Sequence, residues 1–245
     1  MQSFSWEGED VLARKILIDV FGMTRGRYLD IGAHHPYNLS NTALLYSEGW
    51  RGINIDAMPG SMEEFRLHRP DDVNIESPVA AAPGVLRFTV FNDPGLNGFV
   101  DDRQVEAHKL RGIEVLDQFE LQCKTVESLL DEHRISSIDL MSIDVEGLDG
   151  EILATFPFHR VRPKLIITEV LACHSASDVK RTPSHKVLRR KGYMLFSRLH
   201  MSCIYIDRAA YCSRIASRER PVYAASWLSW IWVRLKIKMG FIASY

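Results

Sequence analysis

The sequence predicts an α/β fold built on a mostly parallel sheet with helices on both faces. Short apolar segments alternate along the chain with amphipathic helical segments, which is the pattern of strands joined by crossover helices. Two of the apolar segments, 27–31 and 137–143, end beside acidic residues and a glycine. Ligands bind at the carboxyl ends of strands in such sheets, so both ends are candidate parts of a binding site.

Helices are predicted where apolar residues recur at helical spacing and a capping residue or a glycine marks an end. The first covers 9–21 and is ended by Gly22. The second begins after Ser40 or Asn41 and is ended by Gly49. Further helices are expected at 60–68, 125–133, 151–156 and 182–191.

Strands are predicted from short apolar runs bounded by turn residues. Segment 85–91 alternates between apolar and polar residues, which indicates an added, more exposed strand. Segments 193–196 and 202–206 are expected to close the sheet as an antiparallel pair. Segment 92–121 is the least regular part, and its turn-rich start is typical of loops that carry specificity. The remaining strands are expected at 27–31, 52–56, 73–77, 137–143 and 164–169.

Composition limits the class of protein. A chain of 245 residues, 46% of them hydrophobic, is long enough for one large domain, and a net charge of -1 argues against a nucleic-acid partner. No cysteine pair has CxxC spacing, so a structural zinc site is not expected. We expect the cysteines to be reduced thiols of a cytoplasmic protein. We expect neither a signal peptide nor a membrane span. The cysteines are Cys123, Cys173, Cys203 and Cys212.

The turn after the first strand indicates a nucleotide ligand without a dinucleotide fingerprint. Asp30 and Gly32 end that strand, and the missing Cβ of glycine allows close backbone approach to a ligand. His34 and Tyr37 occupy the places of the second and third fingerprint glycines, which argues against NAD. Asp56 ends the next strand, where a carboxylate can accept both ribose hydroxyls of an adenosine. The alternative for either aspartate alone is a turn or helix cap.

Five sequence elements together resemble the FkbM-type S-adenosylmethionine-dependent methyltransferases, and a sixth, 166–169, matches more weakly. The resemblance implies the Rossmann-like class I methyltransferase fold, with seven strands and a reversed last strand. The resemblance covers roughly residues 3–206, and we expect a methyltransferase domain at 1–210, with a helical segment at 1–24 and a core at 25–210, followed by a basic, aromatic tail at 211–245. The five elements lie at 5–10, 29–33, 49–56, 125–127 and 138–147.

The resemblance also implies the cofactor and the reaction. The cofactor is expected to be S-adenosylmethionine, and the reaction O-methylation of a hydroxyl on a sugar, glycan or secondary metabolite, as in polysaccharide biosynthesis. Many members have Asn and Gly where this chain has His34 and Pro36, and Lys where it has Ser142. The cofactor loop is therefore a variant, and its two adjacent histidines are alternative metal ligands. The expected cofactor-binding residues are Asp30, Gly32, Ala33, His34, Tyr37, Asp56, Ala57, Ser77 and Asp144.

Acidic residues at two strand ends are the catalytic candidates. An acceptor hydroxyl is a poor nucleophile near neutral pH and needs a general base or a metal ion. Asp144 and Glu146 are the best-placed acids, and His174 is the best histidine candidate for the base. Asp144 and Glu169 are also candidate ligands of a divalent metal. The alternatives are a helix cap for Glu146 and a surface loop for His174.

The C-terminal segment 222–242 combines tryptophans with basic residues, a composition typical of a membrane-interface helix. A helix packed on the domain or in a homodimer contact is the alternative. We therefore expect a cytoplasmic protein and leave open peripheral contact at the inner face of the membrane. Two other functions stay open: a NAD-dependent oxidoreductase on a related sheet, and a non-catalytic, membrane-associated binding protein with a methyltransferase fold. The residues concerned are Trp227, Trp230, Trp232, Arg234, Lys236 and Lys238.

Overall fold

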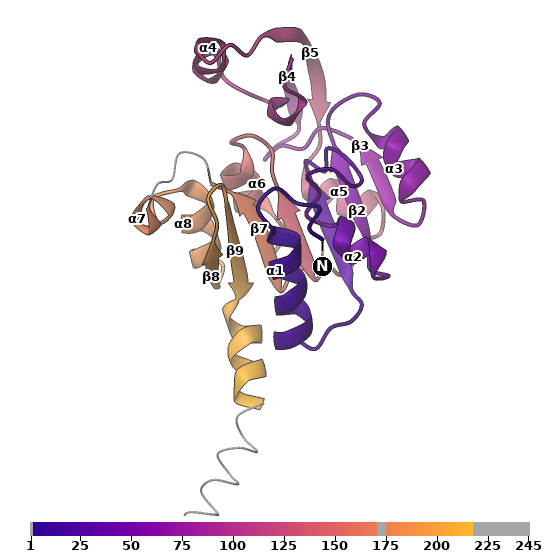
Figure 1. Cartoon of the computed structure of the whole chain (residues 1–245), viewed down its shortest axis with the longest axis vertical. Helices are drawn as coiled ribbons and strands as arrows, with labels where there is room; N and C mark the ends of the chain where they lie inside the picture. Colours follow the sequence, from indigo (N-terminus) through magenta and orange to yellow (C-terminus); the bar gives the residue numbers. More distant parts are fainter. Residues whose placement is uncertain (1, 171–174, 218–245) are drawn as a thin grey trace, which may run out of the picture. The chain divides into compact units, whose positions relative to one another are not determined.

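The computed structural model describes residues 2–170 and 175–217 and divides the chain into two compact units, Met1–Asp207 and Arg208–Tyr245. The first unit holds the sheets and the helices packed on them (Figure 1). In the second unit, 208–217 is helical. The tail segment 222–242 lies outside the described residues, so its membrane or packing role stays a prediction. Among the described residues, no helix is both long and apolar enough to cross a bilayer.

A seven-stranded sheet forms the centre of the first unit, in the order β3-β2-β1-β6-β7-β9-β8. Neighbouring strands from β3 to β7 are parallel, and β9 is antiparallel to both β7 and β8. This arrangement confirms the predicted α/β class, the seven strands and the reversed last strand. The strands are β1 (Arg27–Ile31), β2 (Arg51–Asp56), β3 (Val73–Glu76), β6 (Leu140–Ile143), β7 (Leu165–Glu169), β8 (Tyr193–Arg198) and β9 (Ser202–Asp207).

Helices cover both faces of this sheet (Figure 1). On one face, α5, α6 and α8 share a continuous apolar core with β1, β2, β6 and β7, built from buried residues such as Ile31, Leu129 and Leu153. On the other face, α1 contacts α2 and β9. The helices are α1 (Glu9–Lys15), α2 (Ala43–Ser47), α3 (Met62–His68), α5 (Val126–Glu132), α6 (Asp149–Thr155), α7 (Ala176–Val179) and α8 (Pro183–Arg190).

Local sequence signals explain some of the helix starts. Thr125 and Thr182 cap α5 and α8, each accepting a backbone amide three residues ahead on its hydroxyl. The predicted helix at 9–21 is only partly α-helical, because it continues from α1 into a π-helical turn at Ile16–Val20. The four-residue helix α7 was not predicted.

Segment 92–121, predicted to be the least regular part of the chain, forms an ordered arm together with the strand predicted at 85–91. Strand β4 (Gly84–Phe91) pairs antiparallel with β5 (Val115–Cys123) to form a separate two-stranded sheet. Between them lie the short helix η2 (Pro94–Leu96) and α4 (Asp102–Leu110), which Asp101 and Gln104 start as a capping box. The sequence did not predict α4, because a helix with few apolar residues gives little periodic signal.

Candidate active site

The candidate site is a pocket of about 440 Å³ at the carboxyl ends of β1, β2, β3 and β6. Its floor comes from residues at these strand ends, including Gly32, Asp56, Ser77 and Asp144. The arm contributes the opposite wall, largely with the aromatic and aliphatic side chains of Phe88, Val90, Phe91, Phe99 and Leu116. A pocket of this size, mostly apolar with a few polar groups, is typical of a site for a small organic ligand.

Gly32 allows two strand ends to meet beneath the pocket. Its φ of 78° lies in the left-handed region, and a Cβ at this position would lie 1.8 Å from the carbonyl oxygen of Asp144. The amides of Gly32 and Ala33 both donate to the carbonyl of Ile55, at 2.9 and 3.0 Å. Only glycine can combine this conformation with this contact, so Gly32 brings β1, β2 and β6 together at the site.

Asp56 joins the cofactor loop to the end of β2. One of its carboxylate oxygens accepts the amide of His34 at 2.9 Å, and the other accepts the amide of Met58 at 2.8 Å. The carboxylate also lines the pocket, where each oxygen keeps a further acceptor position. Asp56 therefore acts as a turn cap and can still accept ribose hydroxyls. These residues, with Ser77 and Val79 beyond them, fit an adenosine-containing cofactor.

The predicted cofactor residues divide into two groups. Gly32, His34, Asp56, Ala57, Ser77 and Asp144 line the pocket. Asp30, Ala33 and Tyr37 do not: Asp30 and Ala33 are buried, and the ring of Tyr37 packs edge-on against His68 at 5.4 Å between centroids. The carboxylate of Asp30 accepts the hydroxyl of Thr42 at 2.7 Å, and burial raises the pKa of Asp30. The structure thus gives Asp30 a role below the cofactor loop.

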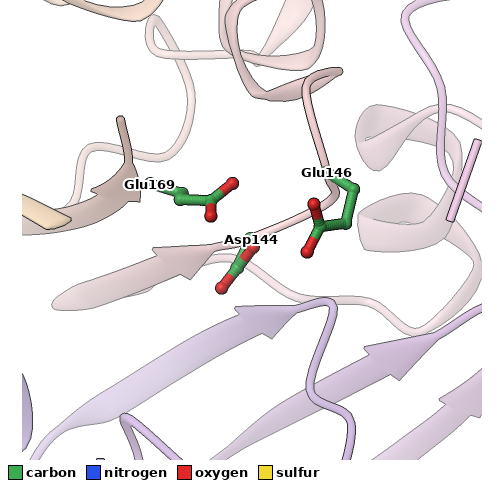
Figure 2. Close-up of side chains that lie close together, drawn as sticks. All are labelled: Asp144, Glu146 and Glu169. Carbon is green, nitrogen blue, oxygen red and sulfur yellow. The ribbon is translucent and has the colours of Figure 1, made fainter. Parts of the chain in front are cut away.

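Three carboxylates converge beside the pocket. Oxygens of Asp144, Glu146 and Glu169 all lie within 4.8 Å of one another, and Figure 2 shows these side chains gathered at the ends of two adjacent strands. Parallel pairing of β6 with β7 aligns Ile143 with Thr168, so the next residues along the two strands meet. The left-handed turn at Glu146, with φ 52°, follows β6 directly.

Burial and mutual repulsion keep protons on this cluster. Burial comes first and neighbouring carboxylates second in raising the pKa of Glu169 to about 10, that of Glu146 to about 8 and that of Asp144 to about 6. Asp144 has the lowest pKa of the three and is therefore the most readily ionised. The nearby Asp149, which accepts the hydroxyl of Thr168 at 3.3 Å, has a pKa raised to about 7 by burial and by Asp144.

The cluster also fits a cation. The oxygen Oε2 of Glu169 is buried and has no hydrogen-bond partner among the described residues. Hard divalent cations prefer oxygen ligands such as these carboxylates. By contrast, within residues 2–170 and 175–217, His34 and His35 join no group of three or more possible metal ligands. The ring nitrogen Nδ1 of His35 instead accepts the amides of Tyr37 and Asn38, at 3.0 and 2.9 Å.

One predicted site residue lies outside the described part of the chain, and one wall of the pocket was not predicted. His174 lies outside the described residues, so its role as a base stays a prediction. The aromatic wall of the arm was missed, although the turn-rich loop at its centre carried a signal of specificity. A Cβ on Gly98 in that loop would lie 2.9 Å from the Cβ of Glu146, so the arm reaches the turn that carries Glu146.

The chain was compared with curated protein sequences and with solved structures. No curated protein sequence matches the chain. Among solved structures, fibrillarin of Methanococcus jannaschii, a pre-rRNA processing protein, is 12% identical with a TM-score of 0.44, over 83% of this chain and 77% of that one. A TehB-like SAM-dependent methyltransferase of Corynebacterium glutamicum is 12% identical with a TM-score of 0.38, over 82% of this chain and 88% of that one.

A family model gives the decisive match. The model of the methyltransferase FkbM domain matches residues 30–195, a span that begins in β1 and ends in β8. It covers the cofactor loop, the arm and all three carboxylates of the cluster. The match extends over more than half of the chain. The chain therefore belongs to the FkbM family of methyltransferases.

Proposed function

We propose that this methyltransferase uses S-adenosylmethionine to methylate a hydroxyl of a sugar, glycan or secondary metabolite. The observation that carries the proposal is that Asp56 lines the same pocket as Asp144 and Glu146, two members of the carboxylate cluster. Asp56 can accept the ribose hydroxyls of a cofactor, and the cluster can accept a proton from a hydroxyl. A family of methyltransferases implies S-adenosylmethionine as the methyl donor, and transfer to oxygen is our addition.

Binding of the cofactor is supported by the shape and chemistry of the pocket. Ser77 and Val79 offer a polar and an apolar surface at the end of β3, where an adenine would lie beyond the ribose. When bound, S-adenosylmethionine would supply an electrophilic methyl group on a sulfonium. Asp144 and the loop around Gly32 close the other end of the pocket, so their part is to hold and align the reacting groups.

Removal of the acceptor proton is supported by the graded acidity of the cluster. A general base works best when its pKa lies near the working pH. The pKa of Glu146, raised to about 8 by burial and by Asp144, meets this condition, and Glu146 lines the pocket. Ionised Asp144 would orient the hydroxyl, and its charge would favour the neutral, protonated form that Glu146 reaches when it takes the hydroxyl proton, while the acceptor oxygen bonds to the methyl group. Glu169, whose pKa is raised to about 10, would stay protonated and donate a hydrogen bond within the cluster.

A divalent cation is the second candidate for activating the hydroxyl. It is favoured by the unpartnered Oε2 of Glu169, because a bound cation would satisfy that oxygen and relieve the repulsion among the three carboxylates. Asp144, Glu146 and Glu169 would then be ligands, and a metal-bound hydroxyl would lose its proton at lower pH. The two candidates predict different responses to chelation.

Methyl transfer to a panel of acceptors tests the proposal. The purified chain would be incubated with methyl-labelled S-adenosylmethionine and neutral sugars, glycans or polyketide alcohols, and mass spectrometry of the products would locate the label. We expect label on oxygen. Activity that survives chelation supports the carboxylate base, whereas loss that magnesium restores supports the cation. Label found only on nitrogen or carbon would contradict O-methylation, and reduction of NAD with these alcohols would favour an oxidoreductase.

A further inference from the structure

We propose that Arg69 is a positioning residue that holds the cofactor loop, in which no glycine follows Gly32. Arg69 follows α3 and is fully buried, with 0% of its surface exposed. The loop concerned, 32–42, joins β1 to α2 and carries His34 and Pro36 at family positions where many members have Asn and Gly. The inference rests on the proposed cofactor, because it concerns the loop that would bind it.

The guanidinium of Arg69 donates hydrogen bonds to this loop between Pro36 and Thr42. Its Nη2 donates to the carbonyl of Pro36 and to the hydroxyl of Ser40, the latter at 2.8 Å. Its Nη1 donates to the hydroxyl of Thr42 at 2.8 Å and to the side-chain oxygen of Asn54 at 3.3 Å. One side chain therefore connects the end of α3, the loop and β2.

The same side chain is linked to the end of β1. The hydroxyl of Thr42, which accepts from Arg69, donates in turn to Asp30 at 2.7 Å. Ser40 also accepts the amide of Ala43 at 3.1 Å, which starts α2. Burying an arginine costs free energy unless its charge and its donors find partners. The hydrogen bonds and opposite charges around Arg69 must therefore offset this cost. Buried Asp30 and Asp72 supply the opposite charge near Arg69.

The hydrogen bonds of Arg69 affect the pocket through the loop that they hold. Between Gly32 and Ser40, His34 and Leu39 line the pocket, and both adopt positive φ values of 56° and 59°. Such conformations are unfavourable for residues other than glycine and persist where the surroundings hold them. A glycine-rich loop would adopt them freely. In this chain, the contacts of Arg69 at Pro36 and Ser40 hold the segment that contains Leu39, and Asp56 holds the amide of His34.

Arginine cannot be replaced here by another cation without loss. Two nitrogens of Arg69 each bond two acceptors, and the planar guanidinium fixes their directions. A lysine would keep the charge opposite Asp30 and Asp72 but would bring a single nitrogen. A methionine would remove the charge and every donor while keeping an unbranched side chain. The three side chains therefore form a series in which loop positioning decreases stepwise.

Calorimetric titration of S-adenosylhomocysteine into the whole chain tests this inference. We compare the wild type with Arg69→Lys and Arg69→Met, and take Arg66→Met on the exposed face of α3 as the control. At a temperature where circular dichroism shows each variant folded, Arg69→Met should bind at least about tenfold more weakly, a loss of about 1.4 kcal/mol. Arg69→Lys should recover part of the affinity, and Arg66→Met should bind like the wild type.

Hydrogen exchange separates positioning from stability. The ligand should slow amide exchange in segment 33–40 of the wild type and of Arg66→Met, and should do so much less in Arg69→Met. A folded Arg69→Met protein with wild-type affinity and wild-type protection would overturn the inference. If Arg69→Met does not fold, Arg69→Lys and Ser40→Ala take its place, and unchanged affinity in both would overturn it equally. A wild type that does not bind the ligand would instead overturn the proposed function, and this inference with it.

Discussion

The carbonyl oxygen of Asp144 occupies the space that a side chain on Gly32 would need, 1.8 Å from the position of its Cβ. The end of β1 and the end of β6 are thus in direct backbone contact. Through this contact the cofactor loop and the carboxylate cluster share one edge of the sheet. The account of this enzyme depends on that closeness, since methyl transfer requires donor and acceptor to be aligned within one pocket.

Gly32→Ala should weaken cofactor binding for this reason. The new methyl group cannot coexist with the oxygen of Asp144, so one strand end must move. We expect S-adenosylhomocysteine affinity to fall by about tenfold or more, measured by calorimetry, for a loss of about 1.4 kcal/mol or more. Gly49→Ala is the matched control, because Gly49 also has a positive φ, of 89°, but nothing lies within 4 Å of a Cβ there. Equal affinity in the two variants would contradict the contact.

Asp56→Ala should weaken the cofactor through two effects. It removes the acceptor for ribose hydroxyls, and it frees the amides of His34 and Met58 from the carboxylate. Losing charge-assisted hydrogen bonds of this kind costs about 1.5–3 kcal/mol, or roughly tenfold or more in affinity. Calorimetry checks this, with the exposed Asp71→Ala as the control. Wild-type affinity in a folded Asp56→Ala protein would remove Asp56 from the cofactor site.

Amide substitutions in the cluster should reduce turnover far more than binding. Asp144→Asn and Glu146→Gln keep the shape of each side chain and remove its capacity to take a proton. We expect kcat to fall by about 10²–10⁴-fold, the usual contribution of general acid–base catalysis. Initial rates with labelled donor, beside calorimetric affinities for S-adenosylhomocysteine, give the comparison. If both amides keep near-normal rates, the base lies elsewhere, and His174 becomes the next candidate.

The pH dependence of the reaction should follow Glu146. A base works only when ionised, and the pKa of Glu146 is raised to about 8 by burial and by Asp144, so activity is lost as the pH falls below that value. We expect kcat/KM to rise with pH and level off above about pH 8. In the Glu146→Gln variant this step should disappear. The profile is measured at a constant ionic strength of about 0.1 M, so that screening of charges does not change with pH. A wild-type profile that is flat between pH 6 and pH 9 would argue against Glu146 as the base.

Glu169→Gln should stabilise the protein at pH 8. The folded pKa of Glu169 is about 10, raised from an ordinary 4.5 mainly by burial, so between these values the folded state binds more protons than the unfolded state. Stability conferred by that proton is therefore full below the lower value and falls as the pH rises toward the higher one. Glutamine avoids this loss. Thermal unfolding should show a higher Tm for Glu169→Gln than for the wild type at pH 8.

The size and the pH dependence of that difference provide the check. A change of 1 kcal/mol shifts the Tm of a chain of this length by about 2–4 °C, which calorimetry resolves. At pH 5 the gain should shrink, since the unfolded glutamate is then partly protonated. Glu127→Gln on the exposed face of α5 should leave the Tm unchanged at both values. A loss of stability at pH 8 would mean that the charge of Glu169 is favourable in the fold, as it would be beside a bound cation.

The sequence predicted those features that depend on neighbours along the chain. Strand ends, helix caps and the acidic turn after β6 all follow from local patterns. The different roles of Asp30 and Asp56 show the limit of such patterns. Both look like an acid at a strand end, but Asp30 still pairs within β1 while Asp56 is the last residue of β2. Asp30 lies opposite Asn54, two residues before Asp56, so its carboxylate lies deeper in the sheet, where it accepts the hydroxyl of Thr42, whereas that of Asp56 lies at the strand end and reaches the pocket.

Long-range pairing explains what the sequence left out. Strand β5 has an exposed, polar pattern and forms only because β4 lies beside it, with Phe88 opposite Phe119. The aromatic wall of the pocket depends on that pairing. Arg69 likewise gave no signal, since one arginine after a helix is ordinarily a surface residue. Its burial results from the meeting of α3, the cofactor loop and β2.

Calorimetric titration of the wild-type chain with S-adenosylmethionine and, separately, with NAD tests the central claim most directly. The pocket described above predicts binding of S-adenosylmethionine with a Kd within about 1 µM–1 mM, the ordinary range for enzyme substrates. It predicts no measurable heat with NAD, because the loop after β1 lacks the glycines that a pyrophosphate needs. Binding of NAD in that range without binding of S-adenosylmethionine, or binding of neither ligand, would contradict the account.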